Sequence, residues 1–264
     1  MNPAKQYFTL VKKFKEGVRD TGFLKSLAYA AQTAYDEEMQ TQASDLYIAA
    51  HKDPTERQNL EFIVNFTHST NSTGFKVLLE NYEKADEILG NYKASKLIVS
   101  LITNEEIFSK LNRNKKPTED DWKNFESSLK SKYPVFANEV LLAGKVKAYK
   151  AFQEWDNFFA TVVDYMKLYL PKIDDNELNE MAWAFFEKND NTEYLTQALV
   201  WSKKSITNEN PNPAFIDTYA NLLHKLGKTN EAIEWETKAI SLVEGDEKKS
   251  YEETLEKMKK GEKT

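Results

Sequence analysis

Residues 213–240 read PAFIDTYANLLHKLGKTNEAIEWETKAI, and this stretch decides the fold. Apolar and small residues recur every three or four positions on both sides of a Leu-Gly-Lys turn, which is the pattern of two amphipathic helices. Gly227 follows the first helix, where a left-handed C-cap favours glycine. Because helices joined by so short a turn pack antiparallel, the stretch predicts a helical hairpin.

A second copy of this hairpin precedes the first. Ala198 and Ala232 are 34 residues apart, and so are Ser205 and Ala239. Trp183 and Tyr219 are 36 apart, so the earlier turn is about two residues longer, and the surplus falls on residues 189–192. A fixed period of this length indicates a solenoid of stacked hairpins.

These segments resemble the tetratricopeptide repeat. The specific features are the combination of Leu226-Gly227-Lys228 with Glu231-Ala232-Ile233-Glu234 and Lys238-Ala239-Ile240. Two positions depart from the family pattern: Ile216 stands where the family often has Trp, and the aromatic of the second helix is displaced by one residue at Trp235-Glu236. The resemblance implies a right-handed array of hairpins whose first helices line a concave groove for a peptide or a partner protein.

The resemblance extends to two further regions. A third copy lies near the N-terminus, where small and apolar residues recur at Leu27, Ala30, Ala31, Ala34, Ala43, Tyr47 and Ala50, and Asp53-Pro54 closes it. Residues 136–170 have a suitable length for a fourth hairpin, with small residues at Ala143, Ala148 and Ala151. We therefore divide the continuous solenoid into N-terminal hairpins (1–54), a divergent helical middle (55–133) and C-terminal hairpins with a capping helix (134–264).

Helical periodicity continues through the rest of the chain, and no convincing strand alternation appears. The chain has only 8 Gly and 7 Pro in 264 residues, which argues against many tight turns. Expected helices include 75–89 with a break near Asn81, a long helix over 94–111, and one opened by Thr118 with Asp121 as its capping-box partner. The predicted fold class is all-α, an α-α superhelix.

A second resemblance concerns the helical region that follows a thioredoxin-fold domain in some envelope proteins of Bacteroidetes. It rests on residues 59–62, 75–81 and 183–187. This resemblance implies that the chain is a helical accessory domain of a larger thioredoxin-like redox or envelope protein, with a periplasmic or envelope location. Without it, we expect a cytoplasmic protein. The chain contains no Cys, so thiol redox chemistry would belong to another part.

Composition excludes several functional classes. The charge balance of 36 basic against 42 acidic residues argues against nucleic-acid binding, and no apolar run is long enough for a membrane span. All glycines are isolated, so no phosphate-binding loop is expected, and we predict no cofactor. His51, His68 and His224 are far apart and form no metal-ligand motif.

The acidic clusters admit two interpretations. They lie at 36–38, 119–121, 174–175 and 252–253, and we expect them at helix starts, where acidic side chains favour the helix dipole. A helical enzyme that uses buried carboxylates is the less favoured alternative. No catalytic, metal or cofactor residue is therefore assigned.

The aromatic residues point instead to packing and binding. Most of the five Trp residues are expected as core side chains between hairpins, and Tyr29 and Tyr35 are candidates for a concave groove. Residues around Tyr251, Leu255 and Met258 are typical of a capping helix, with a detachable recognition helix as the alternative. The sequence favours a non-catalytic scaffold that binds another protein or peptide.

Overall fold

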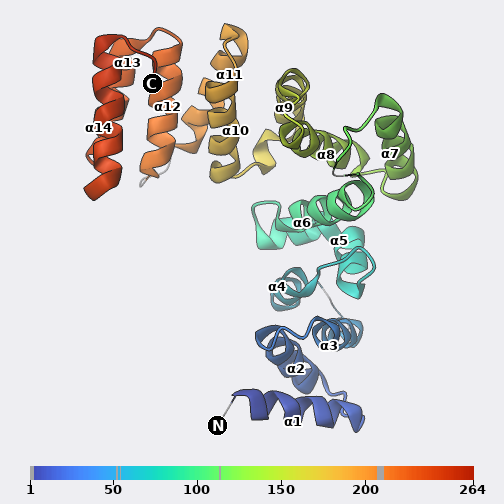
Figure 1. The fold of residues 1–264 in the computed structure, drawn as a ribbon. Coiled ribbons are helices and arrows are strands. Elements are labelled where there is room, and N and C mark those ends of the chain that lie inside the picture. The colour runs from blue at the N-terminus through green and yellow to red at the C-terminus, as the bar shows by residue number, and fades with distance from the viewer. Residues whose placement is uncertain (1–2, 52, 54, 113, 207–210) are drawn as a thin grey trace. The chain divides into compact units, whose positions relative to one another are not determined.

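The computed structural model describes residues 3–51, 53, 55–112, 114–206 and 211–264. Within these residues the chain forms helices and turns and no strand, which confirms the all-α fold class. Consecutive helices pack in neighbouring pairs, as expected for a superhelical stack of hairpins (Figure 1). The predicted break at Pro54 lies outside the described residues.

The chain divides into two compact units, residues 1–144 and 145–264. The helices of the first unit are α1 (Pro3–Lys15), α2 (Thr21–Thr33), α3 (Glu37–Ala49), α4 (Arg57–Phe66), α5 (Thr73–Leu89), α6 (Lys93–Ile102), the π-helical turn η1 (Thr103–Phe108) and α7 (Glu119–Lys132). Helix α8 (Ala137–Ala151) crosses the division. The second unit holds α9 (Trp155–Tyr169), the 3-10 turn η2 (Leu170–Lys172), α10 (Asp175–Lys188), α11 (Thr192–Ser205), α12 (Pro213–Lys225), α13 (Thr229–Ile240) and α14 (Gly245–Lys260).

In the first unit, α2 and α3 form the predicted N-terminal hairpin. Leu27 and Ala31 of α2 and Ala43 of α3 are fully buried between them, because small side chains allow close helix approach. Asp36 caps α3 by accepting a hydrogen bond from the backbone N–H of Met39 at 2.9 Å. The hydroxyl of Tyr7 donates to the same carboxylate at 2.6 Å, which attaches α1 to the hairpin.

The middle of the first unit contains two irregular helices. Asn81 has non-helical dihedral angles inside α5, which confirms the predicted break. The expected single helix over 94–111 is corrected: α6 ends at Ile102, and the chain continues as a π-helical turn to Phe108. Ile107 in this turn is fully buried and lies against Gly144 of α8.

Three of the four acidic clusters lie at helix starts, as predicted. Asp36 and Asp174 are N-caps, and Thr118 and Asp121 form the predicted capping box of α7. Glu252-Glu253 is the exception, because α14 begins at Gly245 and places both residues in its interior. That prediction was wrong, because the helix starts about two turns before the acidic pair.

The second unit contains the two hairpins that decided the fold. Helices α10 and α11 form one, α12 and α13 form the next, and α14 packs on α13 (Figure 1). Gly227 has φ +77° at the end of α12, which confirms the left-handed cap. The core of the second hairpin and α14 consists of small and apolar side chains with almost no exposure: Ile216, Ala220, Leu223, Ala232, Ala239 and Met258.

Candidate functional site

The residues that the sequence singled out do not converge on one site. His51 lies beyond α3, His68 lies beyond α4 beside Gln40, and His224 belongs to the last turn of α12. Among the residues that the structure describes, no three His, Asp or Glu side chains gather so that they could hold a metal ion.

The two candidate tyrosines occupy different environments. Tyr29 lies on α2, partly exposed, with its ring edge-on to Phe66 at 4.9 Å between ring centres. Tyr35 is 92% exposed in the turn after α2, with φ +56°. That both line a concave groove stays a prediction, and Tyr35 is placed at the tip of its hairpin.

The five tryptophans divide into buried and half-buried residues. Trp122 and Trp201 are buried, and the Trp201 ring meets Phe185 edge-on at 5.2 Å inside the hairpin of α10 and α11. Trp155, Trp183 and Trp235 are only partly buried. Trp183 has a different role, because its ring lines a cleft that the sequence did not predict.

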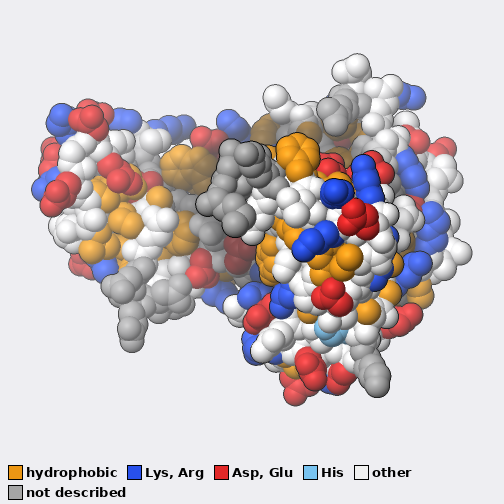
Figure 2. Space-filling view, turned by 90° about the horizontal axis from the view of Figure 1, so that it is seen from below, with side chains coloured by type: hydrophobic (Ala, Val, Ile, Leu, Met, Phe, Trp, Pro, Cys, Tyr) orange, Lys and Arg blue, Asp and Glu red, His pale blue; other side chains and the backbone are white. Residues whose placement is uncertain are grey.

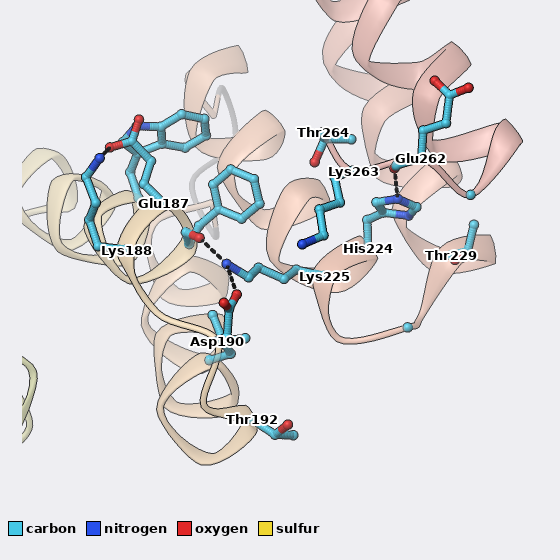
Figure 3. Close-up of a pocket in the computed structure, with 15 residues that line it drawn as sticks. Glu187, Lys188, Asp190, Thr192, His224, Lys225, Thr229, Glu262, Lys263 and Thr264 are labelled. Atoms are coloured by element: carbon cyan, nitrogen blue, oxygen red, sulfur yellow. Dashed lines mark hydrogen bonds and ion pairs between the residues drawn. The ribbon is translucent and has the colours of Figure 1, made fainter.

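The cleft lies in the second unit, at the turn ends of its two hairpins, and has a volume of about 880 Å³ (Figure 3). Its walls come from the end of α10 and the following turn, from the end of α12 and the following turn, and from residues 261–264 after α14. The lining combines an apolar part with a polar rim: Trp183, Phe186 and Leu195 with Lys188, Asp190, His224, Lys225 and Lys263. In the apolar part, the Trp183 and Phe186 rings contact each other at 4.9 Å between centres.

Lys225 joins the two hairpins across the cleft. Its Nζ atom donates to the backbone carbonyl oxygen of Phe186 at 2.7 Å and forms an ion pair with Oδ1 of Asp190 at 2.9 Å. The last carbonyl groups of a helix lack partners within that helix, so Lys225 of α12 caps the end of α10. The contact with Lys225 lowers the pKa of Asp190.

His224, the neighbour of Lys225, contacts the segment that follows α14. Its Nε2 atom lies 2.8 Å from the carbonyl oxygen of Glu262. A carbonyl oxygen only accepts hydrogen bonds, so Nε2 carries the hydrogen in this contact. Gly261, with φ +70°, turns the chain from α14 into this position. One wall of the cleft is thus a short stretch of peptide held through its main chain (Figure 3).

The charged side chains of the cleft rim are of mixed sign. Lys188 pairs with Glu187 at 3.7 Å and lies 6.0 Å from the centre of the Trp155 ring. On the face in Figure 2, basic and acidic side chains are likewise interspersed, without a field of one sign. In the described part of the chain, no helix combines the length and apolar character of a membrane span.

Sequence reasoning missed the cleft for a physical reason. Asp190 lies in the turn of one hairpin, Lys225 ends the first helix of the next, and Glu262 follows α14. The one sequence feature near the cleft was the longer turn at residues 189–192. The repeat spacing identified this turn, but the length of a turn does not indicate a cavity. No family model, no curated protein and no solved structure matches the chain.

Proposed function

We propose that the chain is a non-catalytic module, similar to tetratricopeptide-repeat proteins, that binds a peptide segment of another protein. The observation that carries this proposal is the cleft between the turns of two successive hairpins in the second unit. Its volume of about 880 Å³ suits a segment of a few residues, since ligand sites commonly enclose about 300–1,000 Å³.

The chemistry of the lining also supports a peptide. Trp183 and Phe186 offer a rigid aromatic surface, which is typical of residues that contribute strongly to protein–protein binding. His224 already holds a main-chain carbonyl, which is the group that every peptide presents. The mixed charges of Lys188, Asp190 and Lys263 at the rim suit a polar segment of mixed sign.

The rest of the second unit supplies a rigid frame for such a cleft. Ala220 and Ala232 are fully buried, so α12 and α13 are in close contact, and α10 packs against both α11 and α12. A rigid frame lowers the entropy lost on binding, because the cleft does not have to be ordered by its ligand. This is the arrangement that a scaffold of stacked hairpins provides.

A blocking variant tests the proposal. A random peptide library displayed on phage is selected on the whole protein, and the enriched peptides are synthesised and titrated by calorimetry. Thr192 lines the cleft at the start of α11, and Thr196 is exposed one turn later, outside the lining. We expect Thr192→Trp to weaken binding at least about tenfold, which is about 1.4 kcal/mol, and Thr196→Trp to leave it unchanged.

Two results would contradict the proposal. One is a selection that yields no peptide with measurable affinity for the wild-type protein. The other is equal binding to the Thr192→Trp and Thr196→Trp variants, which would place any peptide site elsewhere. Circular dichroism of both variants verifies that the helices are retained.

A further inference from the structure

A buried carboxyl pair lies away from the cleft, between α12, α13 and α14. Glu236 of α13 has 0% of its surface exposed, and neither of its carboxyl oxygens receives a hydrogen bond from a donor in the described residues. The group that faces it is the carboxyl of Asp217 on α12, which is partly buried. Two acids therefore meet in an apolar region of the second unit.

The hydrogen-bond donors around the two carboxyls indicate that one of the carboxyls is protonated. Ionised carboxylates only accept hydrogen bonds, so two of them in contact leave their oxygens unsatisfied and repel each other. Asn221 Nδ2 donates to Asp217 Oδ1 at 3.0 Å, which suits an ionised Asp217. Glu236 has no such donor, and one of its two oxygens gains a partner if Glu236 is protonated and donates to Asp217.

The surrounding charged groups supply no alternative partner. On α14, the hydroxyl of Tyr251 donates to Glu247 at 3.2 Å. The Tyr251 side chain packs against the apolar core that α12, α13 and Met258 form. Lys203 of α11 and Lys238 of α13 have their Nζ atoms 3.7 Å and 4.9 Å from the centre of the Trp235 ring. In the described chain, no cation forms an ion pair with Asp217 or Glu236 within 4.0 Å.

The titration behaviour agrees with this arrangement. Burial, with the charge of Asp217 and the hydrogen bond to it, raises the pKa of Glu236 to about 9. Burial raises the pKa of Asp217 to about 6, against the opposing effect of its hydrogen bonds with Glu236 and Asn221. Burial and the nearby acidic groups raise the pKa of Tyr251 as well, so Tyr251 stays neutral and supplies no charge to the pair.

Helix α14 packs on α13 and brings Tyr251 close to this pair. Only Met258 of its residues is fully buried, with Tyr251, Thr254 and Leu255 partly buried, so a small apolar face holds it in place. The charges of Asp217 and Glu236 both raise the pKa of Tyr251, so the pair lies close to the residue of this face that packs on the core of α12 and α13. Opening α14 would therefore let water reach the two carboxyls.

We propose that Asp217 and Glu236 share one proton while α14 is docked, and that opening of α14 releases this proton to solvent. The direction of the pH dependence follows from the linkage between proton binding and the docking of α14. The docked state binds a proton that the open state loses at neutral pH, so docking of α14 is favoured at acidic pH and weakens as the pH rises. With one proton released, the opening equilibrium increases tenfold for each pH unit.

Hydrogen exchange of residues 245–260 in the full chain tests the coupling. We expect the protection of α14 in the wild-type protein, corrected for the intrinsic exchange rate, to fall about tenfold per pH unit between about pH 6 and about pH 9. Glu236→Gln keeps a hydrogen-bond donor toward Asp217 but cannot ionise, so its protection should not change with pH. Glu234→Gln, at an exposed position on the same helix, should follow the wild type.

Infrared difference spectroscopy gives a second readout, and its first measurement uses the wild-type protein alone. The wild-type protein at about pH 7.5, a value between the two pKa values, should retain the C=O band of a protonated carboxyl. Asp217→Asn should shift the loss of this band to lower pH, because it removes the neighbouring charge. Absence of the band in the wild type, or equal pH dependence of α14 exchange in the wild type and Glu236→Gln, would overturn the proposal.

Discussion

The Nζ atom of Lys225 lies 2.7 Å from the carbonyl oxygen of Phe186. The last residue of α12 therefore caps the C-terminal end of α10, the first helix of the preceding hairpin. The two residues are 39 positions apart in the chain. This contact fixes the relative position of α10 and α12, and with it the two walls of the cleft.

Removing the charge of Lys225 should destabilise the second unit. Lys225→Met keeps the apolar stem beside Phe186 and leaves the Phe186 carbonyl without its charged donor, so we expect a loss of about 1–2 kcal/mol in the free energy of unfolding. Urea denaturation followed by tryptophan fluorescence measures it. Asp190→Asn is the control: Asp190 is 89% exposed, so its ion pair with Lys225 is screened by water and the change should be small. Equal losses in both variants would contradict the capping role.

Gly144 should not tolerate even a methyl group. A Cβ atom there would lie 2.4 Å from Cδ1 of Ile107, which is fully buried and has little room to move. We expect Gly144→Ala to cost about 1–3 kcal/mol. Ile107→Val removes the clashing methyl, so the double variant should be more stable than the sum of the two single changes predicts.

A matched glycine serves as the control for this experiment. Gly22 lies in α2, and the nearest atom to a Cβ there is Asp20 Oδ1 at 3.6 Å, an ordinary contact. Gly22→Ala should stabilise the protein slightly, since alanine favours the helix. Thermal denaturation of the four variants provides the comparison, and an additive double variant would argue against the clash.

The capping box of α7 should contribute measurably to the first unit. Thr118 Oγ1 accepts from the Asp121 backbone N–H at 3.2 Å, and Asp121 accepts in return from the Thr118 backbone N–H at 2.8 Å. Thr118→Ala should cost about 1 kcal/mol and should speed hydrogen exchange in the first turn of α7. Thr118→Ser should restore most of the protection, because serine also accepts the N-terminal N–H.

The Tyr7 hydroxyl should control the acid titration of Asp36. The pKa of Asp36 is lowered, first by the hydrogen bond from Tyr7 and then by that from the Met39 backbone. A lowered pKa in the folded state stabilises the protein above the ordinary pKa of Asp, and this contribution is lost as the pH falls through the lowered value. Tyr7→Phe should move the pKa of Asp36 toward its ordinary value, measured by NMR titration of the Asp36 carboxyl. An unchanged pKa would show that the helix cap alone sets it.

The sequence predicted those features that depend on neighbours in the chain. The cap at Gly227 and the box at Thr118 follow from residues within one helical turn, and the Ala198 to Ala232 spacing identified the hairpins. The π-helical turn was missed because its residues continue the helical apolar pattern without a Gly or Pro. The start of α14 was misjudged for a different reason, because the residue before Gly245, Glu244, makes no side-chain capping hydrogen bond.

The cleft and the carboxyl pair could not be predicted in this way. Asp217 and Glu236 face each other from opposite helices of one hairpin, 19 residues apart. In the sequence, Trp235-Glu236 appeared only as a shifted aromatic position, because periodicity indicates which face a residue occupies and not which polar group it meets. The function as a peptide-binding module and the link to a thioredoxin-fold protein stay predictions.

The π-helical turn at Thr103–Phe108 is a place where the length of the chain can change. A π-helical turn holds one residue more than an α-helical turn, so removing one residue here would leave an ordinary α-helical turn and keep the faces of the residues that follow. Inside α6, where the turns are already α-helical, the same deletion would rotate every following side chain by about 100°. A single-residue deletion that spares Ile107, which lies against Gly144, should therefore be tolerated better in Thr103–Phe108 than in Lys93–Ile102.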